Sequence, residues 1–167
     1  MYRIVLTLLL MAGIYTAMRS FEAPEPEAAG VQGAAYVHDG DTFTVAGVKI
    51  RLFGIDAPEM AQTCEMPDGT DWACGRWSRD EVRRILTGQD LRCIQQDRDR
   101  YGRMVARCFL QDQDLAERLV REGIVFSYAR YSRDYIGVEN RAKAAQRGLW
   151  QAKTVAPAEY RRQKREN

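Results

Sequence analysis

The chain has 167 residues, of which 46% are hydrophobic and 29% charged, and its formal net charge is only +2. This length allows one domain with a hydrophobic core and is short for two. The composition excludes an intrinsically disordered protein, and so small a net charge gives no evidence by itself of a polyanionic partner. Any electrostatic argument therefore depends on where the charges lie along the chain.

The first apolar segment is expected to lie outside the fold. Residues 4–18 carry no charged side chain and follow Arg3 and the amino terminus, a pattern typical of a secretory signal or a short membrane anchor. We expect residues 1–21 to direct export, with an anchor favoured over cleavage because no good small-residue cleavage site follows. A buried N-terminal helix is the alternative. The acidic sequence after Arg19 places the following domain on the periplasmic or extracellular side.

Residues 22–33, rich in Pro, Glu and Ala, are predicted to be a linker, and the folded domain is predicted to span residues 34–155. Strands are predicted over residues 34–38, 42–45, 48–55, 91–95 and 104–110, with a brief extended piece at 124–128. Helices are predicted over residues 75–86, 115–122 and 139–147, each with a glycine shortly after its end. Residues 156–167 are expected to be a basic, frayed tail.

Five short strands with a helix after the third and two helices at the end do not fit a parallel sheet of βαβ units. They favour a small closed barrel with helices packed on it, and the five-stranded oligonucleotide/oligosaccharide-binding barrel (OB-fold) is the expected architecture. We therefore predict an α+β, mainly β, domain: a five-stranded OB-fold barrel with three packed helices. This fold does not by itself define a function.

The chain contains four cysteines, and all of them follow the apolar segment. An even number fits an oxidising compartment, where three pairings are possible. Zinc binding is the alternative, but the chain has no C-x-x-C motif and a single histidine, His38, which we expect to be structural. We predict the pair Cys64–Cys74, which brackets a loop rich in breakers, and the pair Cys93–Cys108, whose strands "QDRDRYG" folds into a hairpin.

Two aspartates are predicted to meet at one end of the barrel. Asp41 in "DGDT" shares strand parity with Phe43, which should point inward, and Asp56 ends the neighbouring strand. A hairpin turn at Ala46–Gly47 brings both aspartates to the same open end. Carboxylate oxygens gathered in this way suit a hard cation, although an isolated "DGD" is more often an ordinary turn.

Two arginines accompany these acids. Arg51 lies within the strand "VKIRL", and Arg103 begins a strand after the turn "DRYG". Taken singly, each is better explained as a solvent-exposed side chain. Taken together and in order, "VHDGDTFTV", "IRLFGIDAPE", "DRYGRMVA" and "LVREGI" resemble the thermonuclease-like family of the staphylococcal nuclease type, from about residue 34 to residue 150.

The resemblance implies a five-stranded barrel with three helices and calcium-dependent hydrolysis of phosphodiester bonds in DNA, RNA or both. It also implies a role for particular residues. The calcium ligands would be Asp41, Asp56 and the carbonyl of Ala57. The catalytic residues would be Arg51 and Arg103, which hold the scissile phosphate, and Glu59, the general base.

These residue types suit the chemistry. A phosphodiester is an anion that resists attack by hydroxide, so its hydrolysis needs charge neutralisation and an activated water. Calcium would supply a Lewis acid, and planar guanidinium groups donate paired hydrogen bonds that a lysine does not. Glu59, on a loop stiffened by Pro58, can reach a water molecule beside the metal.

Two positions depart from the family pattern. Ala57 stands where the family often has threonine, which leaves the metal preference open. Of two tyrosines that cover the nucleotide in the family, Tyr131 matches one and Ala129 stands at the other, so that Tyr128 or Arg130 would have to compensate. Base stacking on an aromatic ring contributes about 1–3 kcal/mol.

Further phosphate contacts are expected at Arg100, beside the hairpin turn, and at Lys49. The predicted protein is a monomeric, exported nuclease, tethered to the membrane or secreted, and the motifs fit DNA and RNA equally. One alternative is a non-catalytic nucleic-acid-binding module on the same barrel, although such modules tend to lose the arginine–glutamate–arginine set that this chain retains. A membrane-anchored structural protein that only binds calcium is the second alternative.

Overall fold

The computed structural model describes residues 29–166. The predicted export segment, residues 1–21, and most of the predicted linker lie outside these residues. Within the described part of the chain, no helix combines the length and the apolar character that a membrane crossing requires.

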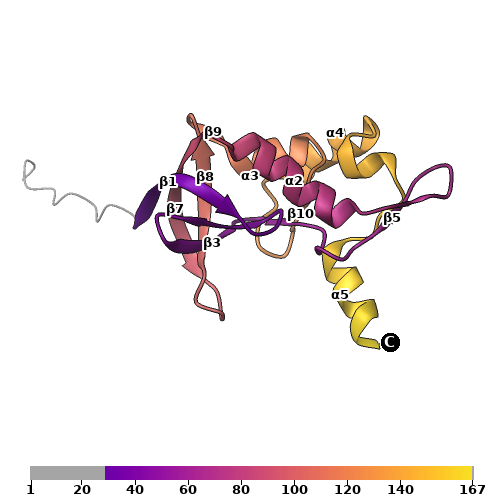
Figure 1. Ribbon diagram of the computed structural model, residues 1–167, viewed down its shortest axis with the longest axis horizontal. Helices are drawn as coiled ribbons and strands as arrows, with labels where there is room; N and C mark the ends of the chain where they lie inside the picture. Colours follow the sequence, from indigo (N-terminus) through magenta and orange to yellow (C-terminus); the bar gives the residue numbers. More distant parts are fainter. Residues whose placement is uncertain (1–28, 167) are drawn as a thin grey trace, which may run out of the picture.

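The described residues form a β-barrel and helices that extend from one side of it (Figure 1). The strands are β1 (Gly30–Val37), β2 (Thr42–Val45), β3 (Val48–Leu52), β4 (Ile55–Asp56), β5 (Cys64–Glu65), β6 (Asp71–Trp72), β7 (Asp90–Arg98), β8 (Met104–Leu110), β9 (Gln113–Asp114) and β10 (Phe126–Ser127). The helices are α2 (Cys74–Leu86), α3 (Leu115–Arg121), α4 (Ile136–Ala144), the 3-10 helix η1 (Gly148–Gln151) and α5 (Pro157–Glu166).

Strands β1, β2, β3, β7 and β8 make the barrel, in the order β3-β2-β1-β7-β8. A parallel pairing between β3 and β8 closes it, with Ile50 opposite Met104 and Leu52 opposite Ala106. The predicted five-stranded barrel is therefore confirmed. Strand β1 begins at Gly30 rather than residue 34, because residues 30–34 pair with β7. Gly30, Gly33 and Ala34 carry little strand signal of their own, so pairing with β7 decides the conformation of this segment.

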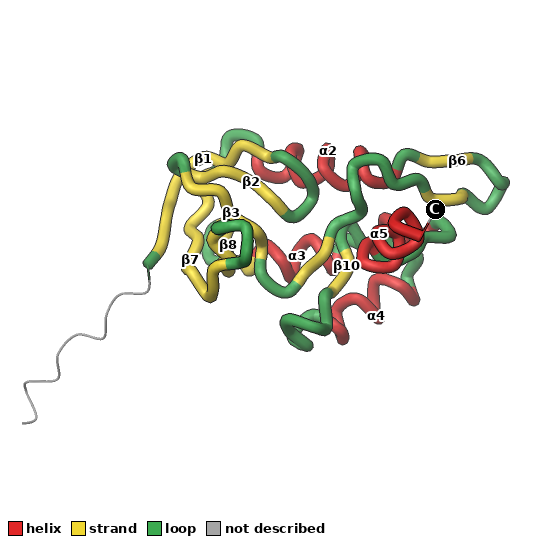
Figure 2. Tube along the Cα trace, turned by 90° about the horizontal axis from the view of Figure 1, so that it is seen from below, coloured by secondary structure: helices red, strands yellow, loops and turns green. Residues whose placement is uncertain are grey.

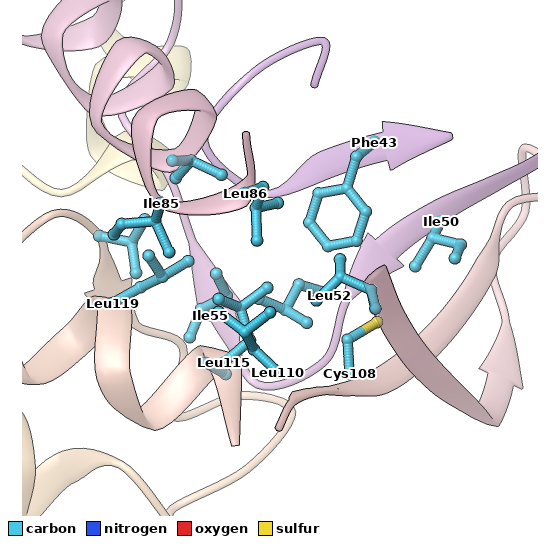
Figure 3. Packing of buried hydrophobic residues seen from close by; sticks show 14 of the residues in the cluster. Phe43, Ile50, Leu52, Ile55, Ile85, Leu86, Cys108, Leu110, Leu115 and Leu119 are labelled. Carbon is cyan, nitrogen blue, oxygen red and sulfur yellow. The ribbon is translucent and has the colours of Figure 1, made fainter. Parts of the chain in front are cut away.

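The core lies between the barrel and the first two helices. In Figure 3, Phe43, Ile50 and Leu52 of the barrel face Ile85 and Leu86 of α2. All five side chains are buried, and full burial of one such side chain contributes about 1.5–3 kcal/mol. In β3 the buried Ile50 and Leu52 alternate with the more accessible Lys49 and Arg51, and this alternation fixes the register of the strand.

Four α-helices are present among the described residues, one more than the sequence predicted. Helix α2 agrees with the predicted helix to within one residue at each end, and α4 begins and ends three residues earlier than predicted. Residues 157–166, expected to be frayed, form α5. Pro157 suits its first position, and Glu159 in the first turn with Lys164 and Arg165 in the last complement the helix dipole.

Both predicted disulfides are present. Cys64–Cys74 joins β5 to the start of α2, and Cys93–Cys108 links directly opposed residues of β7 and β8. Bridges of this kind typically contribute about 2–4 kcal/mol. Two disulfides are typical of proteins that fold in an extracytoplasmic, oxidising compartment.

Candidate active site

A cavity of about 660 Å³ lies at the open end of the barrel, and we call it the mouth cavity. Its side chains come from the loops around β2, β4 and β10, from the β7–β8 hairpin and from α5. Its acids are Asp39, Asp41, Asp56, Glu59 and Asp99, its arginines are Arg51, Arg100, Arg103, Arg130, Arg161 and Arg165, and its tyrosines are Tyr101, Tyr128 and Tyr131.

Arg51 joins the two predicted metal-binding aspartates. Its Nη1 donates to Asp41 Oδ2 at 2.6 Å, and its Nη2 donates to Asp56 Oδ1 at 3.0 Å. The pairing of Thr42 with Arg51 across the β2–β3 hairpin brings these groups together. The Arg51 side chain is only 17% exposed, so it is not an ordinary surface arginine. Burial alone would lower the pKa of Arg51, but Asp41 and Asp56 outweigh burial and raise it.

The "DGDT" turn is shaped by its own side chains. Asp39 Oδ1 accepts hydrogen bonds from the N–H groups of Asp41 and Thr42, at 3.0 and 2.7 Å, which is an Asx-type turn. Gly40 packs so tightly that a Cβ there would lie 2.7 Å from the Cβ of Ala57. The Ala57 N–H in turn donates to Asp41 Oδ2 at 3.0 Å. The turn and the loop after β4 therefore hold each other in place.

Glu59 lies on that loop, above the start of α2. A Cβ on Gly75 would lie 1.8 Å from the Glu59 carbonyl oxygen, so the loop can approach α2 only because residue 75 is glycine. Gln62 Oε1 accepts the Glu59 N–H at 3.2 Å. The Glu59 side chain is 40% exposed and extends toward the mouth cavity, within reach of a bound water or substrate.

Arg161 of α5 belongs to this site and was not identified from the sequence. Its Nη2 donates to Asp56 Oδ2 at 2.8 Å, and its Nη1 donates to Glu59 Oε1 at 2.6 Å. In Figures 1 and 2, α5 lies away from the β1–β7–β8 part of the barrel. The Tyr160 hydroxyl of α5 donates to the carbonyl of Ala61, in the loop that carries Glu59. The only sequence signals for this helix were Pro157 and the basic composition that follows it.

Arg103 faces the acids from the β7–β8 hairpin. Its Nε donates to Asp99 Oδ2 at 2.7 Å, and its Nη1 donates to Thr42 Oγ1 at 3.2 Å. Asp99 also accepts the N–H groups of Tyr101 and Arg103, which fixes the hairpin turn. Burial opposes the charge of Asp99, but its hydrogen bonds with Arg103 outweigh burial and lower the pKa of Asp99. Asp99 is therefore an anchoring residue for Arg103.

Two acids of the cavity, Asp39 and Asp56, lie in surroundings that disfavour their charged forms. Burial, followed by the charge of Asp41, raises the pKa of Asp39 from 3.8 to about 6. Burial also raises the pKa of Asp56, although hydrogen bonds from Arg161 oppose the rise. A positive charge placed beside an acid whose pKa is raised in this way stabilises its ionised form.

Aromatic side chains line the outer part of the cavity. The rings of Tyr128 and Tyr131 lie with their centroids 5.3 Å apart, and Tyr131 is exposed. Arg100 stacks on the exposed ring of Tyr101, with its Cζ 4.8 Å from the ring centroid. These four side chains form a surface on which an unpaired base can stack.

The predicted substrate contacts are not all placed together. Tyr131 and Arg100 line the mouth cavity, as do both residues suggested to compensate for Ala129, namely Tyr128 and Arg130. Lys49 instead lies within β3 opposite Thr44, and it is not among the residues that line the cavity. Lys49 is exposed on the same strand face as Arg51, but it lies farther from the mouth along β3, toward the Ala46–Gly47 turn.

The donor chemistry fits a hard cation. Asp41, Asp56 and the backbone at Ala57 meet in one place and offer only oxygen ligands of the kind that Ca²⁺ prefers. Among the described residues, no three Asp, Glu, His or Cys side chains form a preassembled metal cluster. Calcium takes about six to eight oxygen ligands, so carbonyl, water and phosphate oxygens would have to complete the shell.

Residues 49–152 match the protein family described as staphylococcal nuclease homologue. The chain is 35% identical over 136 residues to an uncharacterized endonuclease of Escherichia coli O157:H7, a match that covers 77% of this chain and 82% of that protein. It is also 35% identical over 123 residues to the succinoglycan biosynthesis protein ExoI of Rhizobium meliloti, covering 72% of this chain. That match spans 64% of ExoI, less than two thirds of its length.

A plant protein is also similar. The chain is 30% identical over 129 residues to the probable staphylococcal-like nuclease CAN1 of Oryza sativa subsp. japonica, and the match covers 75% of this chain and 36% of that protein. The family match ends at residue 152, so the arginine that α5 brings to the acids lies beyond it.

Proposed function

The chain belongs to the staphylococcal nuclease homologue family, and on this premise we propose that it is a calcium-dependent nuclease that hydrolyses phosphodiester bonds of DNA, RNA or both. The observation that carries the proposal is the gathering of Arg51, Glu59 and Arg103 around one cavity with Asp41 and Asp56. An enzyme is distinguished from a binding module by such a set of roles and not by its fold.

Each side chain has a task in this reaction. Calcium, when bound by Asp41, Asp56 and the Ala57 carbonyl, supplies a Lewis acid beside a phosphate oxygen. Arg51 and Arg103 approach from β3 and from the β7–β8 hairpin, so that they donate hydrogen bonds to the phosphate from two sides. Both then exchange part of their carboxylate contact for phosphate, whose negative charge grows in the transition state.

Glu59 is proposed to accept the proton of the attacking water. The water oxygen forms a bond to phosphorus, one ester P–O bond breaks, and the departing ester oxygen is released with a proton taken up from solvent. The exposed carboxylate of Glu59 suits this task because water reaches it, while Gly75 and Gln62 fix its backbone. Pre-positioning of a general base in this way typically contributes about 10²–10⁴ in rate.

The substrate is proposed to enter between the two aromatic pairs at the rim of the cavity. Tyr128 with Tyr131, and Arg100 with Tyr101, offer stacking surfaces that do not select for a particular base. Such a surface fits single-stranded or frayed nucleic acid better than a paired duplex, whose bases are not free to stack. We also propose that the protein acts outside the cytoplasm, tethered by its N-terminal apolar segment, which agrees with the two disulfides.

The full-length protein, run in gels containing DNA or RNA, provides the test. We expect clearing in calcium, none in a chelator, and recovery when calcium is restored. Glu59→Gln is the matched control, since it keeps the size and hydrogen-bonding shape of the side chain and removes its basicity. Binding of nucleic acid without cleavage in calcium would support the non-catalytic module instead. Calcium binding without nucleic-acid binding would support the structural alternative.

A further inference from the structure

Helix α5 is held in place independently of its arginines. The segment before it forms a short antiparallel bridge with β5, in which Lys153 N–H donates to the Glu65 carbonyl at 2.8 Å and Glu65 N–H donates back at 3.1 Å. The Tyr160 hydroxyl donates to the Ala61 carbonyl at 3.2 Å. Because β5 is linked to α2 by the Cys64–Cys74 disulfide, α5 is fixed to the wall of the mouth cavity.

Arg161 therefore reaches the acids from a fixed support. One guanidinium group bridges Asp56 and Glu59, with donor distances of 2.8 and 2.6 Å. Both oxygens of Asp56 accept hydrogen bonds from arginine, Oδ1 from Arg51 and Oδ2 from Arg161. Exposed ion pairs usually contribute little, but the Asp56 side chain is only 2% exposed and lies between two guanidinium groups.

We propose that Arg161 is a built-in counter-cation of Asp56 and Glu59 that a divalent cation has to displace, so that α5 sets the divalent-cation affinity of the site. The inference rests on the proposed function in one respect, the assignment of Asp56 as a metal ligand. It concerns a residue beyond the family match, which ends at residue 152.

The physical reason is competition for the same carboxylate. Arg161 donates to both Asp56 oxygens, to Oδ2 at 2.8 Å and to Oδ1 at 3.4 Å, and a cation would need lone pairs of the same carboxylate. A guanidinium charge beside a dication is also repulsive. The Arg161 side chain is 37% exposed, so it can turn into solvent without opening a cavity in the core. Its departure also releases Glu59 Oε1, which the proposed general base needs free. Arrival of the cation and availability of the base are thus coupled.

Thermodynamic linkage makes this coupling reciprocal. If docking of Arg161 weakens cation binding by some factor, the bound cation must weaken docking of Arg161 by the same factor. Couplings between two binding events at this range are typically about 5–150-fold. Two independent measurements can therefore detect the effect, one on the cation and one on the Arg161 side chain.

The first measurement is calcium affinity by titration calorimetry on the full chain, without nucleic acid. We expect Arg161→Gln to bind calcium at least about 5-fold more tightly than the wild type. The matched control is Arg162→Gln, which removes the same charge from the neighbouring residue, whose partner is Glu159 and not an acid of the cavity. The calcium affinity of Arg162→Gln should stay within about twofold of the wild-type value, because an exposed charge is largely screened. Equal tightening in both variants, or none in Arg161→Gln, would overturn the inference.

The second measurement is solvent exchange of the Arg161 guanidinium N–H groups by NMR, since these groups are bonded to Asp56 and Glu59. Saturating calcium should speed their exchange and leave that of the Arg162 guanidinium unchanged, and unchanged exchange at Arg161 would overturn the inference. Should Arg161→Gln fold poorly, Arg161→Lys provides the same comparison with a weaker, single-point donor.

Neither readout uses nuclease activity. If the protein is a calcium-activated nuclease but Arg161→Gln binds calcium no more tightly than the wild type, this inference alone is overturned. If Arg161→Gln binds calcium more tightly but the protein cleaves no nucleic acid, only the proposed nuclease function is overturned. Absence of calcium binding in every variant would overturn the calcium site and this inference together.

Discussion

Two networks among the described residues each join an arginine on a barrel strand to aspartates, and they differ in what surrounds the acids. In the mouth network, Arg51 bonds Asp41 and Asp56 beside an open cavity. In the second, the lateral network, Arg107 on β8 bonds Asp134 and donates to the Tyr135 hydroxyl at 3.2 Å.

The side chains of the lateral network make hydrogen bonds and stacking contacts that hold the fold together. The Tyr135 hydroxyl donates to Asp114 Oδ2 at 2.8 Å, and Asp114 Oδ1 caps α3 by accepting the Glu117 N–H. Arg107 also stacks on Phe53, with its Cζ 4.8 Å from the ring centroid. None of these side chains is among those that line the mouth cavity.

The pKa values of Asp56 in the mouth network and of Asp134 in the lateral network shift in opposite directions. The hydrogen bond from Arg107 lowers the pKa of Asp134, whereas burial raises the pKa of Asp39 and of Asp56 in the mouth. The ion pair with Arg107 stabilises the charged form of Asp134, while burial of Asp56 disfavours its charged form. An arginine–aspartate contact is therefore no evidence of function by itself. Acids whose pKa is raised by burial and that line an open cavity are evidence of a functional site.

The largest expected effect is on turnover, and it should be confined to the mouth network. We expect Glu59→Gln and Arg103→Lys to lower turnover by about 10²–10³-fold, or about 2.7–4 kcal/mol, because each acts on charge that develops in the transition state. Glu59→Gln should leave the unfolding midpoint unchanged, since its side chain is partly exposed. Arg51→Lys should lose comparable activity and also some stability, because the buried Asp41 and Asp56 lose a bidentate partner.

Arg107→Lys is the control for this prediction. It makes the same chemical change on the same barrel, at a residue outside the mouth cavity, and turnover should stay near that of the wild type. Steady-state kinetics on single-stranded DNA and on RNA provide the measurement. Turnover of Glu59→Gln within a few-fold of the wild type on both substrates would refute the assigned general base.

The next effect is a loss of stability without a loss of turnover, and it is expected in the lateral network. The buried Tyr135 hydroxyl donates to Asp114 and accepts from Arg107, and Tyr135→Phe removes both hydrogen bonds. Hydrogen bonds to charged groups contribute about 1.5–3 kcal/mol, and we expect the free energy of unfolding to fall by about this amount in urea denaturation. The turnover of the folded variant should not change. A loss of turnover with unchanged stability would place Tyr135 in the active site.

A smaller effect separates the metal ligands from the catalytic groups within the mouth network. Asp41→Asn and Asp56→Asn should shift the calcium concentration for half-maximal activity upward by about tenfold or more, because affinity follows the charge of the ligand set. High calcium should then restore part of the activity. Calcium should not rescue Glu59→Gln, because that variant lacks a reacting group. Equal rescue of all three variants would mean that Glu59 is a ligand.

Sequence patterns predicted the contacts that strand geometry determines. Parity along β2 and a two-residue turn at residues 46–47 were enough to bring Asp41 and Asp56 together, and the β7–β8 hairpin was enough to pair Cys93 with Cys108. The sequence did not predict Arg161, whose partner Asp56 is 105 positions away. Its placement depends on tertiary contacts of residues 153–160, and no local pattern encodes them.

The smallest expected effect tests the opposite pKa shifts of Asp39, which lines the mouth cavity, and Asp134 of the lateral network. Because the pKa of Asp39 rises from 3.8 to about 6 on folding, the folded state binds more protons than the unfolded state between these pH values. Its contribution to stability is therefore present at low pH and is lost as pH rises toward 6. Asp134, whose pKa is lowered, has the opposite dependence, with stability present at neutral pH and lost as pH falls.

Asp39→Asn should consequently raise the free energy of unfolding at pH 7 and have little effect at pH 4, whereas Asp134→Asn should lower it at pH 7. The rise in the Asp39 pKa sets an upper limit of about 3 kcal/mol. We expect about 1 kcal/mol, because the neutral amide of the variant accepts the N–H groups of Asp41 and Thr42 less strongly than a carboxylate does. Urea denaturation at both pH values measures this. Saturating calcium should abolish the gain, since a nearby cation stabilises the ionised Asp39. Destabilisation by Asp39→Asn at both pH values would show that its turn geometry outweighs its charge.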